Sequence, residues 1–290
     1  MAVYPYYDAH CDTLSRCLAE GWDLWENPGH LDLRRLSAYE PAGQVFALYL
    51  DSARVPPSER FARITAQAEL FRRARKAYPA LLERSCLSVE GAELMDCDEG
   101  KLPLVRGWGV RWVNLTWNYP NALSGSCLTG EGLTERGRSF ARRCAALGIG
   151  VDVSHLSDRG FWDLMDLEDV TLLASHSDSR TLCPHPRNLT DEMFRALIER
   201  RGFVGLNYSR GFLGENPTVE TVADHLEHFL ELGGEDQVGL GSDFDGTDVP
   251  GDLSGVQDLP NLWEALYRRN YPESLVKKIA YQNLGRFLGQ

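Results

Sequence analysis

Three features are absent from this 290-residue sequence, and each absence argues against a class of protein. The seven cysteines include no CxxC pair, which argues against a zinc finger or a thioredoxin-like redox site. No apolar stretch approaches the roughly 18 residues that a membrane-spanning helix needs. There is also no excess of basic residues: the net charge is -12, whereas nucleic acids and anionic membrane surfaces require a basic face.

Two further absences bear on location and domain organisation. The N-terminal sequence MAVYPYYDAHCD has no basic segment followed by an apolar core, so no signal peptide is expected. The odd number of scattered cysteines favours reduced thiols and therefore a cytoplasmic protein. No low-complexity linker or charge block interrupts the chain, so residues 1–290 are predicted to form a single domain.

Eight short apolar runs predict the strands of a parallel sheet, because strands buried on both faces are apolar almost throughout. The runs are residues 6–12, 44–51, 85–90, 110–116, 149–155, 171–176, 203–207 and 238–243. Helical patterns occupy residues 57–78, 134–147, 190–201 and 218–232, and the last three begin at a capping threonine. The first connection, residues 14–43, is only partly helical in pattern. This alternation predicts a (β/α)8 TIM barrel.

Histidines and carboxylates end several of these runs, and a (β/α)8 barrel builds its active site at the carboxyl ends of its strands. The residues are His10, Asp12, Glu90, His155, His176 and Asp243. Side chains at i and i+2 share one face of a strand, so His10 and Asp12 form a half-site for a divalent cation while Cys11 points away. A buried carboxylate such as Glu90 needs a cation or strong donors.

These six side chains favour two divalent ions, because they exceed what one tetrahedral zinc can bind. Glu90 is the candidate bridge, and a bridging water would be activated to attack a carbonyl. Asp243 is preferred over Asp245 because it is nearer the strand. A histidine bonded only to the backbone remains the alternative for His155 or His176 taken singly. Elsewhere, His225 and His228 share a helix and are interpreted as part of a solvated face.

Six short phrases resemble the membrane or renal dipeptidase family, which is peptidase family M19 among the amidohydrolase-like barrels. They are DAHCDT, SVEG, LTWN, DVSH, SHS followed by RN, and GLGSDFDG. They occur in the family's order from Asp8 to Gly246, which covers nearly the whole chain. The resemblance implies a (β/α)8 barrel with a binuclear zinc site that hydrolyses dipeptides.

The resemblance also implies roles for individual residues. Five residues would hold the two zinc ions. His10 and Asp12 would hold the first ion, His155 and His176 the second, and Glu90 would bridge the two. Asp243 would orient the bridging water and carry its proton to the leaving amine. Arg187 would pair with the C-terminal carboxylate of the substrate, for which the fork of a guanidinium is suited. Tyr49 would line the substrate pocket.

One position departs from the mammalian pattern. Mammalian members have LTHN where this chain has LTWN, and their histidine polarises the substrate carbonyl; here the position is Trp117. Indole has one N–H donor and cannot take a positive charge. LTWN resembles the bacterial branch of the family. Because of this change, the group that stabilises the oxyanion is not assigned. The range of substrates is therefore not assigned either.

Three functions follow from these observations. The first is a zinc-dependent dipeptidase acting on a small dipeptide. The second is a binuclear amidohydrolase acting on a lactam, a cyclic amide or an N-acyl amino acid. The third is a non-catalytic barrel that binds a peptide or a partner, which the intact set of ligands disfavours. The sequence leaves open the preferred side chains, the choice among zinc, manganese and cobalt, and whether the protein is a homodimer like many family members.

Overall fold

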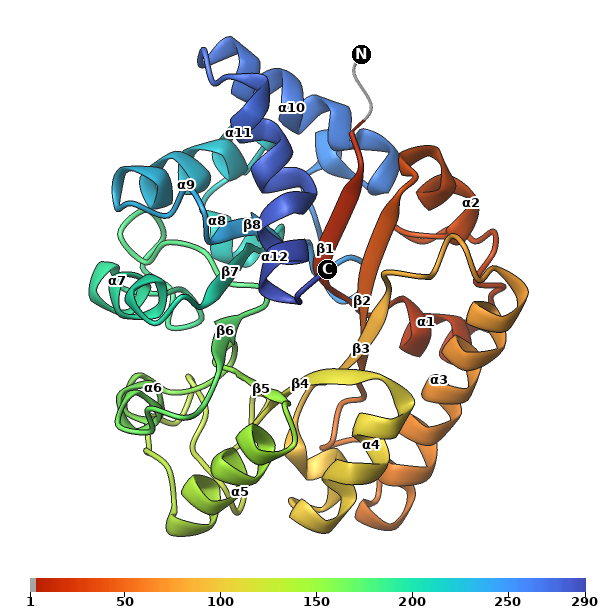
Figure 1. Ribbon diagram of the computed structural model, residues 1–290, viewed down its shortest axis with the longest axis vertical. Coiled ribbons are helices and arrows are strands. Elements are labelled where there is room, and N and C mark those ends of the chain that lie inside the picture. Colours follow the sequence, from red (N-terminus) through yellow and green to blue (C-terminus); the bar gives the residue numbers. More distant parts are fainter. Residues whose placement is uncertain (1–3) are drawn as a thin grey trace.

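A closed barrel of eight parallel strands, paired in chain order, forms the centre of the computed structural model (Figure 1). The structure describes residues 4–290, so the first three residues of the segment used to assess a signal peptide lie outside it. The strands are β1 (Tyr6–Cys11), β2 (Ala42–Leu48), β3 (Cys86–Val89), β4 (Val110–Asn114), β5 (Gly150–Asp152), β6 (Leu172–Ala174), β7 (Phe203–Leu206) and β8 (Val238–Leu240). Each overlaps a predicted run, which confirms the (β/α)8 TIM barrel.

Most of the helices surround the strands on the outside (Figure 1). They are α1 (Thr13–Glu20), α2 (Leu33–Leu36), α3 (Pro57–Ala77), α4 (Leu102–Trp108), α5 (Glu135–Ala146), α6 (Asp158–Met165), α7 (Asp191–Glu199), α8 (Arg210–Leu213), α9 (Val219–Glu231), α10 (Leu259–Arg268), α11 (Glu273–Lys277) and α12 (Asn283–Phe287). The capping threonines are as predicted: Thr134 accepts from the N–H of Gly137, and Thr190 from that of Met193. The first connection is only partly helical, as its pattern indicates.

The buried apolar side chains form two layers, one inside the barrel and one outside it. The inner layer includes Tyr7, Val45, Trp112, Leu173 and Phe203, which come from five different strands and can meet only in the barrel interior. Leu284 and Leu288, from α12 and the residue that follows it, complete this layer, and Figure 1 shows α12 crossing the ring of strands. The amino-terminal end of the barrel is therefore filled with apolar side chains, which leaves the carboxyl end for chemistry.

An irregularity in β1 sets the direction of its last side chains. Tyr7 and Ala9 belong to the inner layer, so strict alternation would also turn Cys11 inward. The register between β1 and β2 shifts between Asp8 and Cys11, and Cys11 packs in the outer layer instead. Such an irregularity in a strand re-aims side chains. It turns His10 inward and places Cys11 away from the side chain of His10, as predicted.

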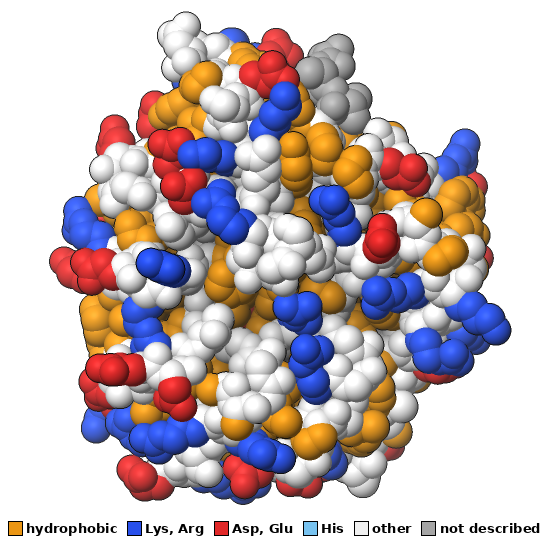
Figure 2. Space-filling view, in the orientation of Figure 1, with side chains coloured by type: hydrophobic (Ala, Val, Ile, Leu, Met, Phe, Trp, Pro, Cys, Tyr) orange, Lys and Arg blue, Asp and Glu red, His pale blue; other side chains and the backbone are white. Residues whose placement is uncertain are grey.

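Figure 2 shows that side chains of both charges lie across the face of the molecule seen in Figure 1. Within residues 4–290, no helix is long and apolar enough to cross a bilayer.

Candidate active site

The structure brings the six residues named from the sequence together at the carboxyl ends of β1, β3, β5, β6 and β8, and all six are buried. His10 lies at the centre of an acidic group. Its Nε2 is 3.6 Å from Asp12 Oδ2, 3.6 Å from Glu90 Oε2 and 3.8 Å from Asp243 Oδ1. Three carboxylates thus face a single imidazole nitrogen.

The two oxygens of Glu90 face different groups. Oε2 faces His10, whereas Oε1 lies 2.8 Å from His155 Nε2 and 3.5 Å from His176 Nε2. The two Nε2 atoms of His155 and His176 are themselves 3.2 Å apart. Glu90 therefore stands between a carboxylate-rich half of the site and a histidine-rich half, each turned toward one of its oxygens.

The charges in this cluster are not balanced by the side chains alone. Burial lowers the pKa of His10, but Glu90, Asp12 and Asp243 outweigh this effect and raise it from 6.5 to about 10. Burial raises the pKa of Glu90, and it raises that of Asp243 to about 6 although His10 opposes the change. Three acidic side chains therefore share the positive charges of His10 and Arg187, which is costly in a buried site without a further cation.

The donor atoms suit a divalent metal. Burial, with Arg187 and His10, lowers the pKa of both His155 and His176, so both are neutral imidazoles, the form that binds metals. The His10 ring nitrogens and Asp12 Oδ1 are buried without hydrogen-bond partners among residues 4–290. A metal would satisfy such atoms, and imidazole with carboxylate is a common ligand set for zinc.

Two of these residues adopt a backbone conformation that side chains other than glycine rarely take. His155 has a φ of 71° and Asp243 a φ of 60°, both in the left-handed region. Both follow the last residue of a short strand by three positions. Strained backbone of this kind is concentrated at functional sites, where the surrounding structure imposes it.

Several supporting residues were missed by the sequence analysis. Asn118 Oδ1 lies 2.9 Å from His155 Nδ1, and Asn207 Nδ2 donates to Asp243 Oδ2 at 3.1 Å. Ser175 lies between His176 and the buried Asp152. Two of them end patterns noted in the sequence: Asn118 ends the phrase LTWN, and Asn207 ends the seventh apolar run. Ser175 is the first residue of the phrase SHS, although no pattern in the sequence indicated that it would lie beside Asp152.

Arg187, Tyr49 and Trp117 lie around the cluster. Arg187 is buried, donates to Ser177 Oγ at 3.3 Å and to the carbonyl of His176 at 3.1 Å, and its Nε has no partner among residues 4–290. The Trp117 ring centre lies 5.2 Å from that of Tyr49 and 6.1 Å from that of His155. A guanidinium and an aromatic wall therefore flank the histidine-rich half.

The interpretation of His225 as solvated is wrong. This residue is fully buried between α9 and the loops of β6 and β7. Its Nδ1 accepts from the backbone N–H of Ser179 at 3.0 Å, so its Nε2 donates to the carbonyl of Leu213 at 3.1 Å. His228 is half-buried and pairs with Asp191 at 2.8 Å. The spacing of two histidines on one helix could not show which of them a neighbouring loop covers.

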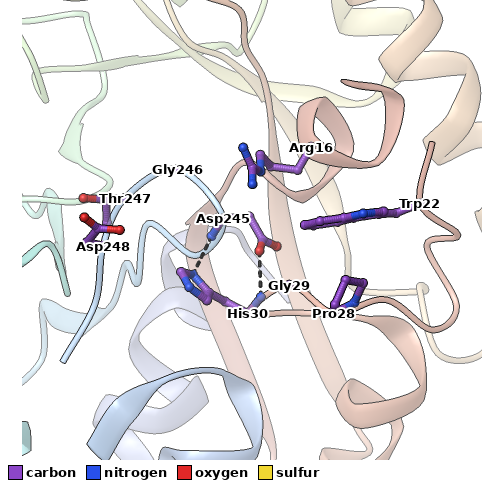
Figure 3. A pocket seen from close by; sticks show the side chains of 9 residues that line it. All are labelled: Arg16, Trp22, Pro28, Gly29, His30, Asp245, Gly246, Thr247 and Asp248. Atoms are coloured by element: carbon purple, nitrogen blue, oxygen red, sulfur yellow. Dashed lines mark hydrogen bonds between the residues drawn. The ribbon is translucent and has the colours of Figure 1, made fainter. Parts of the chain in front are cut away.

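A hollow of about 510 Å³ adjoins the acidic half of the site, between the first connection and the loop after β8 (Figure 3). Asp245 lies on its wall and accepts from Thr13 Oγ1 and from the N–H of His30, so it belongs to this wall and not to the cluster. Gly246 separates the hollow from the carboxylates. A Cβ atom at this position would clash with Asp12 Oδ2 and lie 2.5 Å from Asp243 Oδ1.

Comparison with known proteins agrees with this geometry. The family model described as membrane dipeptidase (peptidase family M19) matches residues 1–290. The chain belongs to the membrane dipeptidase family. A metallopeptidase structure from Rhodobacter sphaeroides, liganded with a phosphinate mimic of the dipeptide L-Ala-D-Ala, is 31% identical, with a TM-score of 0.89 over 99% of each chain.

Two further relatives of this membrane dipeptidase family member are described as dipeptidases. The structure of dipeptidase AC, a metallopeptidase of family M19, is 32% identical with a TM-score of 0.87, over 98% of this chain and 97% of that one. Dipeptidase tcpJ of Claviceps purpurea is 31% identical over 70% of this chain, and the match spans 50% of its own length. The family assignment makes the chain a metal-dependent hydrolase.

Replacing Gly246 by alanine should weaken metal binding, because the added methyl group would displace the Asp12 and Asp243 carboxylates. We expect a loss of affinity of roughly tenfold or more, the scale seen when residues that support metal ligands are changed. Competition with a chromogenic chelator measures it. Gly251→Ala, in the same loop, is the matched control, because a Cβ there meets no atom of the described residues within 4 Å. Equal affinities in the two variants would contradict the prediction.

Metal-free protein should lose stability as the pH rises above about 6.5. The folded-state pKa of His10 is raised from 6.5 to about 10, so its stabilising contribution is present below the lower value and lost as the pH rises through the upper one. A bound metal takes the place of this proton. Thermal unfolding at about pH 7 and about pH 9.5, with and without a chelator, measures the difference. A pH dependence that is the same in both states would count against it.

Proposed function

We propose that the protein is a zinc-dependent dipeptidase that holds two Zn²⁺ ions and cleaves short peptides with a free C-terminal carboxylate. The observation that carries this proposal is that the two carboxylate oxygens of Glu90 face different groups. Oε2 faces His10, and Oε1 faces His155 and His176. A carboxylate in this position suits two ions a few ångströms apart. Different histidines lie near the two oxygens, and the residues on either side alone offer too few donor atoms to hold two ions.

The ligand sets follow from this division. The first ion would be held by His10 and Asp12, the second by His155 and His176, and Glu90 would be shared between them. When bound, the ions would activate a water molecule for attack and polarise the peptide carbonyl. Imidazole with carboxylate is a ligand set typical of zinc, although manganese and cobalt accept the same atoms.

Asp243 would act as the proton carrier. Its Oδ2 is held by Asn207 Nδ2, which leaves Oδ1 directed at the cluster, 3.8 Å from His10 Nε2. An oxygen in this position can take a proton from the attacking water and deliver it to the leaving amine. Glu90 would act by fixing the two halves relative to each other, and Asp243 by moving the proton.

The substrate would lie between Arg187 and the aromatic wall. A buried guanidinium with an unpartnered Nε suits a carboxylate, and such charge-assisted bonds are strong and directional. Tyr49 and Trp117 would contact the substrate side chains. The phosphinate bound by the Rhodobacter sphaeroides metallopeptidase mimics a dipeptide, which supports a substrate of this size.

Trp117 favours one alternative, a binuclear amidohydrolase acting on a lactam, a cyclic amide or an N-acyl amino acid. An indole N–H can donate one hydrogen bond to an oxyanion but cannot provide a positive charge. A strained lactam has a more reactive carbonyl than a peptide bond, so its hydrolysis depends less on that charge. The seven free thiols also support a reducing compartment, and we propose a cytoplasmic location.

A substrate panel tests the proposed function. We expect zinc-loaded protein to hydrolyse L,L- or L,D-dipeptides with higher kcat/KM than lactams or N-acyl amino acids. Amides of the same dipeptides should react roughly 30-fold more slowly or worse, because losing a buried charge partner costs about 2 kcal/mol or more. Released amino acids measure the rates, and metal content is determined on the same samples. No turnover of any dipeptide by protein with two bound ions would refute a dipeptidase, and preference for lactams would establish the alternative.

Replacing Asp243 by asparagine should separate metal binding from proton transfer. The amide keeps the size of the side chain but cannot accept and release a proton, so we expect kcat to fall by about 100-fold or more. Both ions should remain, as measured by elemental analysis. Asp245→Asn, two residues along the chain and outside the cluster, provides the comparison. Turnover by the Asp243 variant at the wild-type rate would remove this residue from the mechanism.

A further inference from the structure

A buried pair of residues behind the histidine-rich half of the site, Asp152 and Ser175, has no role in the mechanism above. Asp152 ends β5, and Ser175 directly follows β6. Both side chains are fully buried. Ser175 Oγ contacts Asp152 Oδ2 on one side and lies 2.6 Å from His176 Nδ1 on the other. The pair thus connects the end of one strand to a proposed metal ligand on the next.

The directions of these hydrogen bonds follow from what each group can donate. Asp152 Oδ1 already accepts from the backbone N–H of Ser154 at 2.9 Å and from that of Ser175 at 3.0 Å. A carboxylate only accepts, so the Ser175 hydroxyl must donate its single proton to Asp152 Oδ2. Ser175 Oγ can then only accept from His176. The proton of the neutral His176 ring must therefore be on Nδ1, which leaves a lone pair on Nε2.

A parallel arrangement holds the neighbouring ligand. Asn118 Oδ1 lies 2.9 Å from His155 Nδ1, and an amide oxygen accepts, so His155 also carries its proton on Nδ1. The Nε2 lone pairs of His155 and His176 then face each other across 3.2 Å, beside Glu90 Oε1. Three electron-rich atoms converge on one point, an arrangement that only a cation stabilises.

We propose that Asp152 and Ser175 are positioning residues that fix the tautomer and the ring orientation of His176 for the ion shared with His155. The inference rests on the proposed function, since it concerns one of the two ions. Groups that hold a metal-binding histidine typically contribute 10- to 100-fold in metal affinity. The other half of the site has no such device, because neither ring nitrogen of His10 has a hydrogen-bond partner among residues 4–290.

Two substitutions test the pair in different ways. Ser175→Ala removes the acceptor for His176 Nδ1 and should weaken the binding of one zinc ion roughly 10- to 100-fold while the other keeps its affinity. Asp152→Asn offers an N–H to Ser175, which turns the serine hydroxyl toward His176 and favours a proton on Nε2. It should weaken the same ion at least as much, because the proton then occupies the ligating atom.

The control is Ser88→Ala, which removes another buried serine hydroxyl from a barrel strand. Ser88 lies on β3 two residues before Glu90, and its Oγ has no hydrogen-bond partner within residues 4–290. Chelator competition on full-length protein gives the affinity of each ion, and circular dichroism establishes folding. Ser88→Ala should bind both ions as wild type does. Wild-type affinity for both ions in the folded Ser175 and Asp152 variants would overturn the proposal.

A second measurement does not depend on metal binding. Nitrogen-15 chemical shifts of the histidine rings report which nitrogen is protonated, and they can be recorded on metal-free wild-type protein. His176 should carry its proton on Nδ1 in the wild type and on Nε2 in the Asp152→Asn variant. A wild-type proton on Nε2 would overturn the proposal even if a variant failed to fold. Wild-type protein that binds fewer than two ions would instead refute the proposed function, with the tautomer still decided by the shifts.

Discussion

The structure depends on one electrostatic constraint: Asp12, Glu90 and Asp243 converge in a buried space around the single imidazole of His10. Carboxylates in a low-dielectric site repel one another, and burial penalises each charge separately. The pKa values of Glu90 and Asp243 are raised because burial penalises their charged forms, and the pKa of His10 is raised by the carboxylates around it. Protons or metal ions must supply the missing positive charge, so the site is built for cations before any substrate is considered.

Hydrogen bonds made by side chains, more than backbone pairing between strands, hold these groups close together in the barrel. In the half from β5 to β8, three of the four strands have only three residues, so few ladder bonds join them. Side chains bridge the strand ends instead: Asp152 from β5 to β6, Asp178 to the N–H of Asn207 beyond β7, and Asn207 to Asp243 beyond β8. Asp8 closes the ring by accepting from Ser242. Buried acceptors of this kind make the rim rigid and pre-organise the site.

The elements predicted from the sequence were those with a simple local pattern. Apolar runs predicted all eight strands because strands buried on both faces leave that pattern. His10, Glu90 and His176 could be named because a polar residue after such a run has few structural explanations. The helix caps at Thr134 and Thr190 followed from local chemistry. Each of these inferences needs only residues that are near in sequence.

The remaining features depend on residues that are distant in sequence or on broken local rules. Burial of His225 depends on a loop that returns from β6, and Ser175 matters only because Asp152 lies on the neighbouring strand. His155 and Asp243 leave the strand conformation for positive φ, so the period that predicts a strand cannot say where their side chains point. Hydrogen bonds with Asn118 and Asn207, respectively, hold these two side chains in the cluster. Chemistry is concentrated where the regular pattern ends, which is why the strands were easier to predict than the directions of the side chains beyond them.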